Sequence, residues 1–370
     1  MHPAISSVRK LYDTLPQAFR LVEEELKKRN RAVGPNGYPF APIFWQKMAG
    51  SLASGHLKNL PVERRTEKEL WSLTGIFTSI VPMLMNWNVT RQIYRLDETT
   101  RDHLMETESS GSLPLDIFNR LPHTCFYVEE NSTIPSPSGT GVIDIVGFWV
   151  RLVNSKEDDG ADRSDLMFLL NRKSESGKGL VSHFGGAFYL PLVSEDSRDY
   201  YIKNGPSVSS MMRFAESESG FNRTGEVNRS GLNPMVNWIE SRINILLYLA
   251  SEKPDLVEGQ KERIGLGVSE SNSSERPKSK TTYWDVGFRE GADFRKRLAS
   301  LTDGQSLEGD GQKSGVKPHW RRAHWHRFWK GSKNDLESRV LVPRWVAAVP
   351  VASVELDIEN QPTVRRRMRP

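Results

Sequence analysis

The sequence predicts an α+β fold in which an antiparallel sheet with flanking helices is followed by a C-terminal Trp/His/Arg-rich β-ribbon. Three observations predict it. Apolar residues recur at spacings of three or four early in the chain and again around residue 240, which is typical of amphipathic helices. Between residues 115 and 193, apolar runs are separated by Ser, Gly, Asp and Pro clusters, which indicates strands. Near residue 320, aromatic and basic side chains alternate, which favours a ribbon.

Helices are predicted for most of the first hundred residues. One helix is expected over residues 8–31, although Pro16 indicates a break or a second start within it. A second helix begins near Thr66, which can cap its N-terminus, and runs towards Pro82. A third is expected over residues 83–95, where its aromatic and Met side chains would be buried in the core.

The central part of the chain is predicted to form the sheet. Because no helix of crossover length separates its strands, we expect them to pair in antiparallel fashion. The predicted strands cover residues 124–128, 142–153, 166–170 and 187–190. The later elements are expected to be a helix over residues 235–250 with Pro234 in its first turn, a flexible polar insertion over residues 258–280, a strand over residues 281–286, and a helix through Phe294 and Leu298.

The chain of 370 residues is long enough for more than one domain. We expect an N-terminal helical region at 1–105, an α+β body with flexible insertions at 106–301, and a basic C-terminal β-ribbon at 302–370 that packs on the body. The formal net charge of +5 is uneven, because residues 317–370 hold 12 Lys and Arg against 5 Asp and Glu. Such a basic segment favours a polyanionic partner, although a solvated basic surface has the same composition.

Several classes of function have no signature in the sequence. Cys125 is the single cysteine, which excludes an intramolecular disulfide and favours a cytoplasmic location. No run of 18 or more apolar residues occurs, so we expect no membrane contact. The G-x-S-x-G and Walker-type motifs are missing, and Cys125 lies in an apolar strand segment typical of an inert thiol. We therefore predict no catalytic residue, no cofactor and no enzymatic activity.

The densest chemical feature is the segment 318–330, Pro-His-Trp-Arg-Arg-Ala-His-Trp-His-Arg-Phe-Trp-Lys. If this segment is one extended strand, period two places Arg322, His324, His326 and Phe328 on one face and Arg321, Trp325, Arg327 and Trp329 on the other. A partner strand over residues 339–349 could cross back over a turn at residues 331–335, so that Trp345 meets a Trp of the first strand. The candidate contact residues for nucleic acid or the ribosome are Arg321, Arg322, His324, Trp325, His326, Arg327 and Trp329.

Three interpretations of this segment remain open. His319, His324 and His326 could hold a metal ion, as in a metal-dependent nuclease, but Cys is missing and acidic residues lie only near the turn, so we predict no metal site. Alternatively, the Arg side chains could contact RNA phosphates while Trp and His stack on unpaired bases. In the third interpretation the segment is structural, with Trp rings filling the hairpin core and Arg side chains packed over them.

Four ordered groups of residues resemble a known family. The C-terminal group, which includes Arg321-Arg322, His324-Trp325-His326 and Gly331, resembles the terminal motif of a type V-A anti-CRISPR family, the second to be described. Residues 93–98 resemble a helix end of that family, and residues 121–128 and 147–149 resemble two of its strands. The resemblance extends as islands from about residue 91 to residue 349.

This resemblance implies a protein of a phage or another mobile genetic element that acts in the cytoplasm of a bacterial host. It implies recognition of a polypeptide segment of the type V-A nuclease during translation, followed by loss of the nuclease mRNA through host ribonucleases. On that basis a groove on the body would bind the nascent segment and the ribbon would face the ribosome or mRNA. A general RNA-binding regulator carried by a mobile element is the alternative function.

Overall fold

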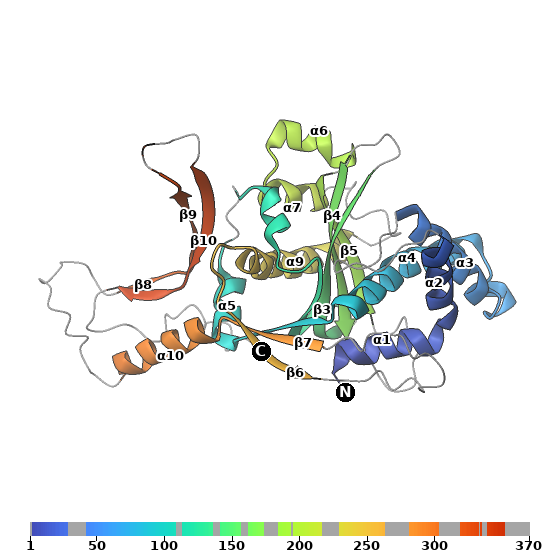
Figure 1. Cartoon of the computed structure of the whole chain (residues 1–370), viewed down its shortest axis with the longest axis horizontal. Coiled ribbons are helices and arrows are strands. Elements are labelled where there is room, and N and C mark those ends of the chain that lie inside the picture. The colour runs from blue at the N-terminus through green and yellow to red at the C-terminus, as the bar shows by residue number, and fades with distance from the viewer. Residues whose placement is uncertain are drawn as a thin grey trace, which may run out of the picture.

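A computed structural model describes most of the chain. The described residues are 2–28, 42–108, 113–135, 141–156, 162–173, 184–193, 195–216, 229–262, 281–302, 319–332, 334 and 339–351. A central sheet separates two groups of helices, and a β-ribbon extends from one of these groups (Figure 1). No helix among the described residues combines the length and the apolar character needed to cross a membrane.

The central sheet has seven strands in the order β5-β4-β3-β2-β1-β7-β6. Their bounds are β1 Gln92–Leu96, β2 Cys125–Pro135, β3 Val142–Lys156, β4 Asp162–Arg172, β5 Phe184–Val193, β6 Leu256–Glu262 and β7 Thr281–Val286. Strands β2 to β5 pair in antiparallel fashion, as predicted, and β6 pairs with β7 in the same way. Strand β1 is parallel to both β2 and β7, so the sheet is mixed. The predicted α+β fold class is confirmed.

Side-chain alternation along the strands divides the core into two layers. On β2, Phe126 and Val128 face one layer, whereas Cys125 and Tyr127 face the other. The first layer is covered mainly by α5 (Glu98–Glu106), α7 (Val208–Glu216) and α9 (Arg229–Leu249), with α6 (Glu195–Asn204), η2 (Leu115–Arg120) and α10 (Phe288–Thr302) around them. The second is covered by α1 (Pro3–Thr14), α2 (Pro16–Lys28), α3 (Pro42–Leu57) and α4 (Glu67–Thr90), with η1 (Val62–Arg64) between the last two.

The N-terminal helices differ from the prediction at two prolines. The predicted helix over 8–31 is divided, because α1 ends at Thr14 and α2 starts with Pro16. By contrast, α4 continues through Pro82 and ends where Arg91 adopts a left-handed backbone conformation with φ 45°. The helix predicted over 83–95 is confirmed as far as Thr90, where it is the continuation of α4, but its end is wrong because residues 92–96 form β1.

Strand β1 also corrects the interpretation of residues 93–98 as a helix end. Ile93 and Tyr94 are fully buried between β2 and β7, which form parallel ladders on both sides of them. Asp97 then caps α5 by accepting a hydrogen bond from the backbone N–H of Thr100 at 3.2 Å. The central sheet thus takes strands from both sides of the predicted boundary between residues 105 and 106.

Two further expectations change in the second half of the chain. Helix α9 starts at Arg229, five residues before Pro234, so this proline is not in its first turn. The insertion predicted over 258–280 begins as strand β6, which runs to Glu262, and residues 263–280 lie outside the described residues. The strand over 281–286 and the helix through Phe294 and Leu298 are confirmed as β7 and α10.

The C-terminal ribbon consists of two short antiparallel pairs. Strands β9 (His324–Lys330) and β10 (Val340–Val346) form the longer pair, in which Trp325 lies opposite Trp345 as predicted. Strands β8 (His319–Arg321) and β11 (Val349–Val351) form a separate pair. Arg322 and Ala323 lie outside both strands, and β8 and β9 pair with different partners, so the prediction of one continuous strand over 318–330 is wrong. Arg321 and Arg322 therefore do not continue the face alternation of β9.

Candidate functional site

The candidate site is the β9–β10 ribbon, which rises beside α9 on the opposite side of the molecule from α1–α4 (Figure 1). Its part nearest to α9 is buried and its far part is exposed. Trp325 and Trp345 are 9% and 5% exposed, whereas Phe328 and Trp329 are 42% and 59% exposed. The two halves of the ribbon therefore have different roles.

The buried half is held in place by hydrogen bonds to the body. The indole N–H of Trp325 donates to Asn244 Oδ1 on α9 at 3.0 Å, and the amide of Asn244 donates to the carbonyl oxygen of Thr107 at 2.8 Å. The indole N–H of Trp345 donates to Thr107 Oγ1 at 3.1 Å, and its ring meets Tyr248 edge-on at 5.5 Å. We name these residues, Trp325, Trp345, Asn244, Thr107 and Tyr248, the ribbon anchor. Because both indole N–H groups are buried and hydrogen-bonded to the body, they fix how this half of the ribbon is oriented on the body.

The exposed half carries aromatic rings on both of its faces. Phe328 and Trp329 are neighbours in β9, so their rings lie on opposite faces of the strand. The ring of His326 meets Phe328 edge-on at 4.4 Å, and the guanidinium of Arg339 lies 5.3 Å from the centre of the Trp329 ring. Large exposed aromatics on both faces of a narrow ribbon are unusual in a surface that contacts only water.

Basic side chains are exposed along the same C-terminal segment. Arg321, Arg322 and Arg344 are exposed, and Arg327 is half-buried. Lys330 forms an ion pair at 2.6 Å with Glu252, which follows α9 in the chain. Residues 319–351 hold seven Lys and Arg against two Asp and Glu, so this segment carries a net positive charge. Such a surface attracts polyanions.

The predicted contact residues from His324 to Trp329 lie on β9, whereas Arg321 ends β8 and Arg322 lies between the two strands. Trp325 belongs to the anchor and is closed to a partner, whereas Trp329, His326, Arg321 and Arg322 are exposed. His324 is half-buried, with its Nδ1 lying 3.1 Å from the carbonyl oxygen of Arg322 and its Nε2 lying 3.3 Å from Arg321 Nη2. The sequence prediction left Phe328 and Arg344 out of the contact set. Their exposure could not be predicted from the alternation of side chains along a strand, because that pattern assumes one buried face, whereas both faces of this half are exposed to solvent.

The histidines do not form a metal-binding cluster in the described part of the chain. His324 and His326 have ring centres 6.5 Å apart and lie nearly perpendicular, and His319 lies on the separate strand β8. No group of three or more His, Cys, Asp or Glu suited to a metal ion occurs among the described residues. The metal-dependent nuclease alternative therefore gains no geometric support from these residues.

Cys125 is a core residue. It is 1% exposed on β2, and its Sγ lies 3.8 Å from the carbonyl oxygen and 3.8 Å from the sulfur of Met83. Burial raises the pKa of the Cys125 thiol to about 12, so the thiol stays protonated at neutral pH. A protonated, buried thiol is a poor nucleophile, which agrees with the sequence interpretation.

A family comparison covers both the sheet and the ribbon. Residues 94–353 match the model of the AcrVA2-like family, described as the anti-CRISPR type V subtype A2 family. The chain belongs to this family. The match begins within β1 and ends two residues after β11, so family membership includes the ribbon and its anchor, while α1 to α4 lie outside the matched range.

A solved structure supports the same fold. A structure titled "Crystal structure of AcrVA2" is similar to this member of the family with a TM-score of 0.56 and 17% sequence identity, and the alignment covers 95% of this chain and 100% of the other. No curated protein matches this chain. At such low identity the structural likeness concerns the fold alone, and the family match supports an anti-CRISPR role.

Proposed function

We propose that this family member lowers production of the type V-A nuclease by binding a polypeptide segment of the nuclease during its translation, in the cytoplasm of a bacterial host. The ribbon then contacts RNA of the messenger or of the translating ribosome. Host ribonucleases cleave the mRNA, and the chain itself is a binding protein. Family membership supports the anti-CRISPR part of this proposal.

One observation carries the RNA-binding part, namely that exposed aromatic rings on β9 and exposed Arg side chains on β10 and before β9 occur in the same C-terminal segment. Arg321, Arg322 and Arg344 can pair with phosphates, and Phe328 and Trp329 present exposed rings on which unpaired bases can stack. Stacking on an aromatic ring contributes about 1–3 kcal/mol per base and tolerates any sequence. This suits a protein that selects its target through the nascent polypeptide and needs only general affinity for the RNA.

The alternative function, a general RNA-binding regulator, would use the same ribbon without any polypeptide. A translational reporter separates the two. Nuclease-coding sequence is fused upstream of a reporter, and a second version carries a single-nucleotide frameshift near its start that is restored before the reporter. The RNA is then nearly unchanged while the encoded polypeptide differs. We expect repression of the in-frame version only, and equal repression of both versions would contradict polypeptide recognition.

Ribbon variants test the RNA contact. The double variant Arg321→Ala/Arg322→Ala should bind single-stranded RNA more weakly, with a salt slope lower by about 1 for each phosphate that the ribbon no longer binds. Lys27→Ala/Lys28→Ala is the matched control, because it removes two exposed basic side chains at the end of α2. Equal salt slopes for the two double variants would refute an RNA contact at the ribbon.

A further inference from the structure

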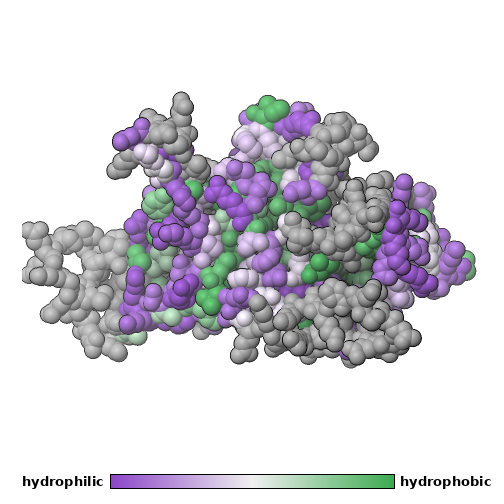
Figure 2. Space-filling view, viewed as in Figure 1, coloured by the Kyte–Doolittle hydropathy of each residue, from purple (hydrophilic) through white to green (hydrophobic). Residues whose placement is uncertain are grey.

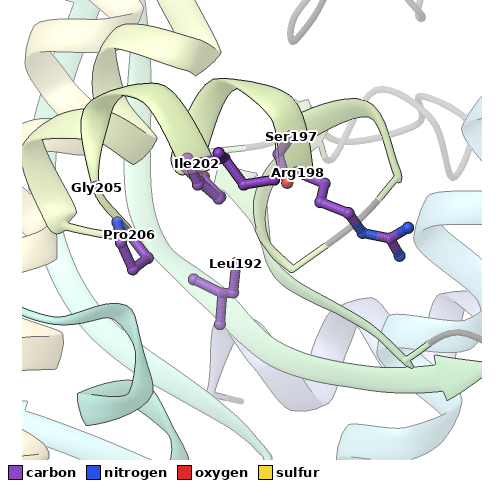
Figure 3. A pocket seen from close by; sticks show the side chains of 7 residues that line it. Leu192, Ser197, Arg198, Ile202, Gly205 and Pro206 are labelled. Carbon is purple, nitrogen blue, oxygen red and sulfur yellow. The ribbon is translucent and has the colours of Figure 1, made fainter.

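A second surface of the body carries a pocket beside helix α6. The pocket has a volume of about 450 Å³ and lies between the end of β5 and the turn from α6 to α7. We name it the α6 pocket, and its lining residues are Leu192, Ser197, Arg198, Tyr201, Ile202, Gly205 and Pro206. In Figure 3, Leu192 lies between Pro206 on one side and Arg198 on the other, with Ile202 on the helix above.

The walls of the α6 pocket are held rigidly. The hydroxyl of Tyr201 donates to the carbonyl oxygen of Pro191 on β5, which joins the helix to the sheet. Gly205 ends α6 with φ 78°, a conformation that favours glycine, and its N–H donates to the carbonyl oxygen of Tyr201 at 2.8 Å. The backbone of Val208 donates to the carbonyl oxygen of Leu113 at 2.9 Å, which fixes the far side of the turn. A preformed pocket loses little entropy when a partner binds.

The opening of the α6 pocket combines an apolar rim with a cation. Ile202 is 78% exposed, more than any other large apolar side chain in the described ranges. Figure 2 shows the corresponding apolar area above α6, next to strongly hydrophilic residues. Arg198 is exposed one turn earlier in the helix. An apolar recess beside such a cation suits a polypeptide that offers an apolar side chain and a nearby carboxylate.

We infer that the α6 pocket binds the polypeptide partner through an apolar anchor side chain, with an Asp or Glu of the same segment meeting Arg198. This inference rests on the proposed recognition of a nuclease segment and adds where that segment binds. The pocket lies beside α6. Helix α6 and the β9–β10 ribbon stand apart from each other on the molecule (Figure 1). Polypeptide and RNA can therefore occupy the molecule together.

Binding of synthetic peptides tests the site. Overlapping fluorescent peptides that cover the type V-A nuclease sequence are titrated with the full chain, and affinity is measured by fluorescence anisotropy. We expect a binding peptide to contain an apolar residue close to an Asp or Glu. Ile202→Asp should weaken binding of this peptide about tenfold or more. The loss of an apolar anchor contact typically costs at least about 1.4 kcal/mol of binding free energy, which corresponds to a tenfold change in affinity. Ile202→Met, which keeps an apolar rim, should stay within about threefold of the unaltered chain.

The matched control is Val62→Asp, which places the same charge on an apolar side chain that is 75% exposed in η1, far from the α6 pocket in the sequence. If Ile202→Asp and Val62→Asp bind the peptide equally well, the α6 pocket is not the site, although nascent-segment recognition stands. If no peptide binds the unaltered chain, the proposed recognition itself fails, and this inference falls with it. Arg198→Gln should reduce the salt dependence of peptide binding, and an unchanged salt dependence would refute the role of Arg198.

Discussion

The ribbon anchor can be tested by replacing Asn244 with Ala. Asn244 is 1% exposed, accepts from the indole of Trp325 and donates to the carbonyl oxygen of Thr107. Asn244→Ala leaves these two buried groups without partners, at about 1–3 kcal/mol each, so docking of the ribbon should weaken by about 2–6 kcal/mol. Whole domains have free energies of unfolding of only about 5–15 kcal/mol. We therefore expect the ribbon to undock before the sheet unfolds.

Hydrogen exchange and urea denaturation together measure this effect. The backbone amides of β9 and β10 should exchange faster in Asn244→Ala, while those of β2 and β3 near the centre of the sheet should keep most of their protection. The matched control is Asn204→Ala, an exposed asparagine whose amide donates to the carbonyl oxygen of Tyr200, and its cost should stay near 0.5 kcal/mol or below. The anchor would be refuted if the two variants had the same ribbon exchange and the same free energy of unfolding.

Three further predictions concern the core. A Cβ at Gly147, where φ is 149°, would lie 2.2 Å from the hydroxyl oxygen of Tyr127. Gly147→Ala should therefore lower the free energy of unfolding, measured by urea denaturation, by at least about 2 kcal/mol. The control Gly50→Ala should not lower it, because the space around Gly50 is open. Burial lowers the pKa of His103 in the folded chain, so the unfolded chain binds a proton at higher pH than the folded chain does. The free energy of unfolding should therefore fall as the pH drops below about 6.5. His103→Phe should reduce this loss in denaturation curves recorded between pH 7 and pH 5. The Cys125 thiol, with its pKa raised to about 12, should react with iodoacetamide at neutral pH only after unfolding, and rapid labelling of the folded chain would contradict its burial.

Local patterns predicted the elements whose partners are near in the sequence. The antiparallel strands β2 to β5 follow one another along the chain, so apolar runs and polar turns were sufficient to predict them. The pairing of Trp345 with a Trp of the first strand was likewise predictable, because β9 and β10 are close in the sequence, and the observed register places Trp325 opposite Trp345. In both cases the residues that specify the structure lie within or next to the element itself.

Strand β1 could not be predicted in this way. Its residues 92–96 follow a long helix without a proline or glycine between them, and they pair with β7, about 190 residues further along the chain. The strand exists because Ile93 and Tyr94 become buried on opposite faces of the sheet, which is a tertiary effect that overrides local preference. Asn244 was missed for a related reason. A single polar residue on an apolar helix gives no sign that an indole from residue 325 will lie against it.

Two residues on one face of β9 differ in burial, so the structural interpretation of the ribbon fits one of them and the proposed RNA contact concerns the other. Trp325 and Trp329 are four residues apart on β9, so their backbone positions differ by about 13 Å along the strand. The first ring is enclosed by α9 and has its indole N–H paired, and it acts as part of the core. The second is exposed beyond the cover of the body, with only Arg339 over it among the cation–π contacts of the described residues. The anchor holds one end of the ribbon, and the Lys330–Glu252 ion pair links the other end to the chain after α9. We therefore expect stability to depend on Trp325, whereas Trp329 can be replaced without the loss of a buried contact.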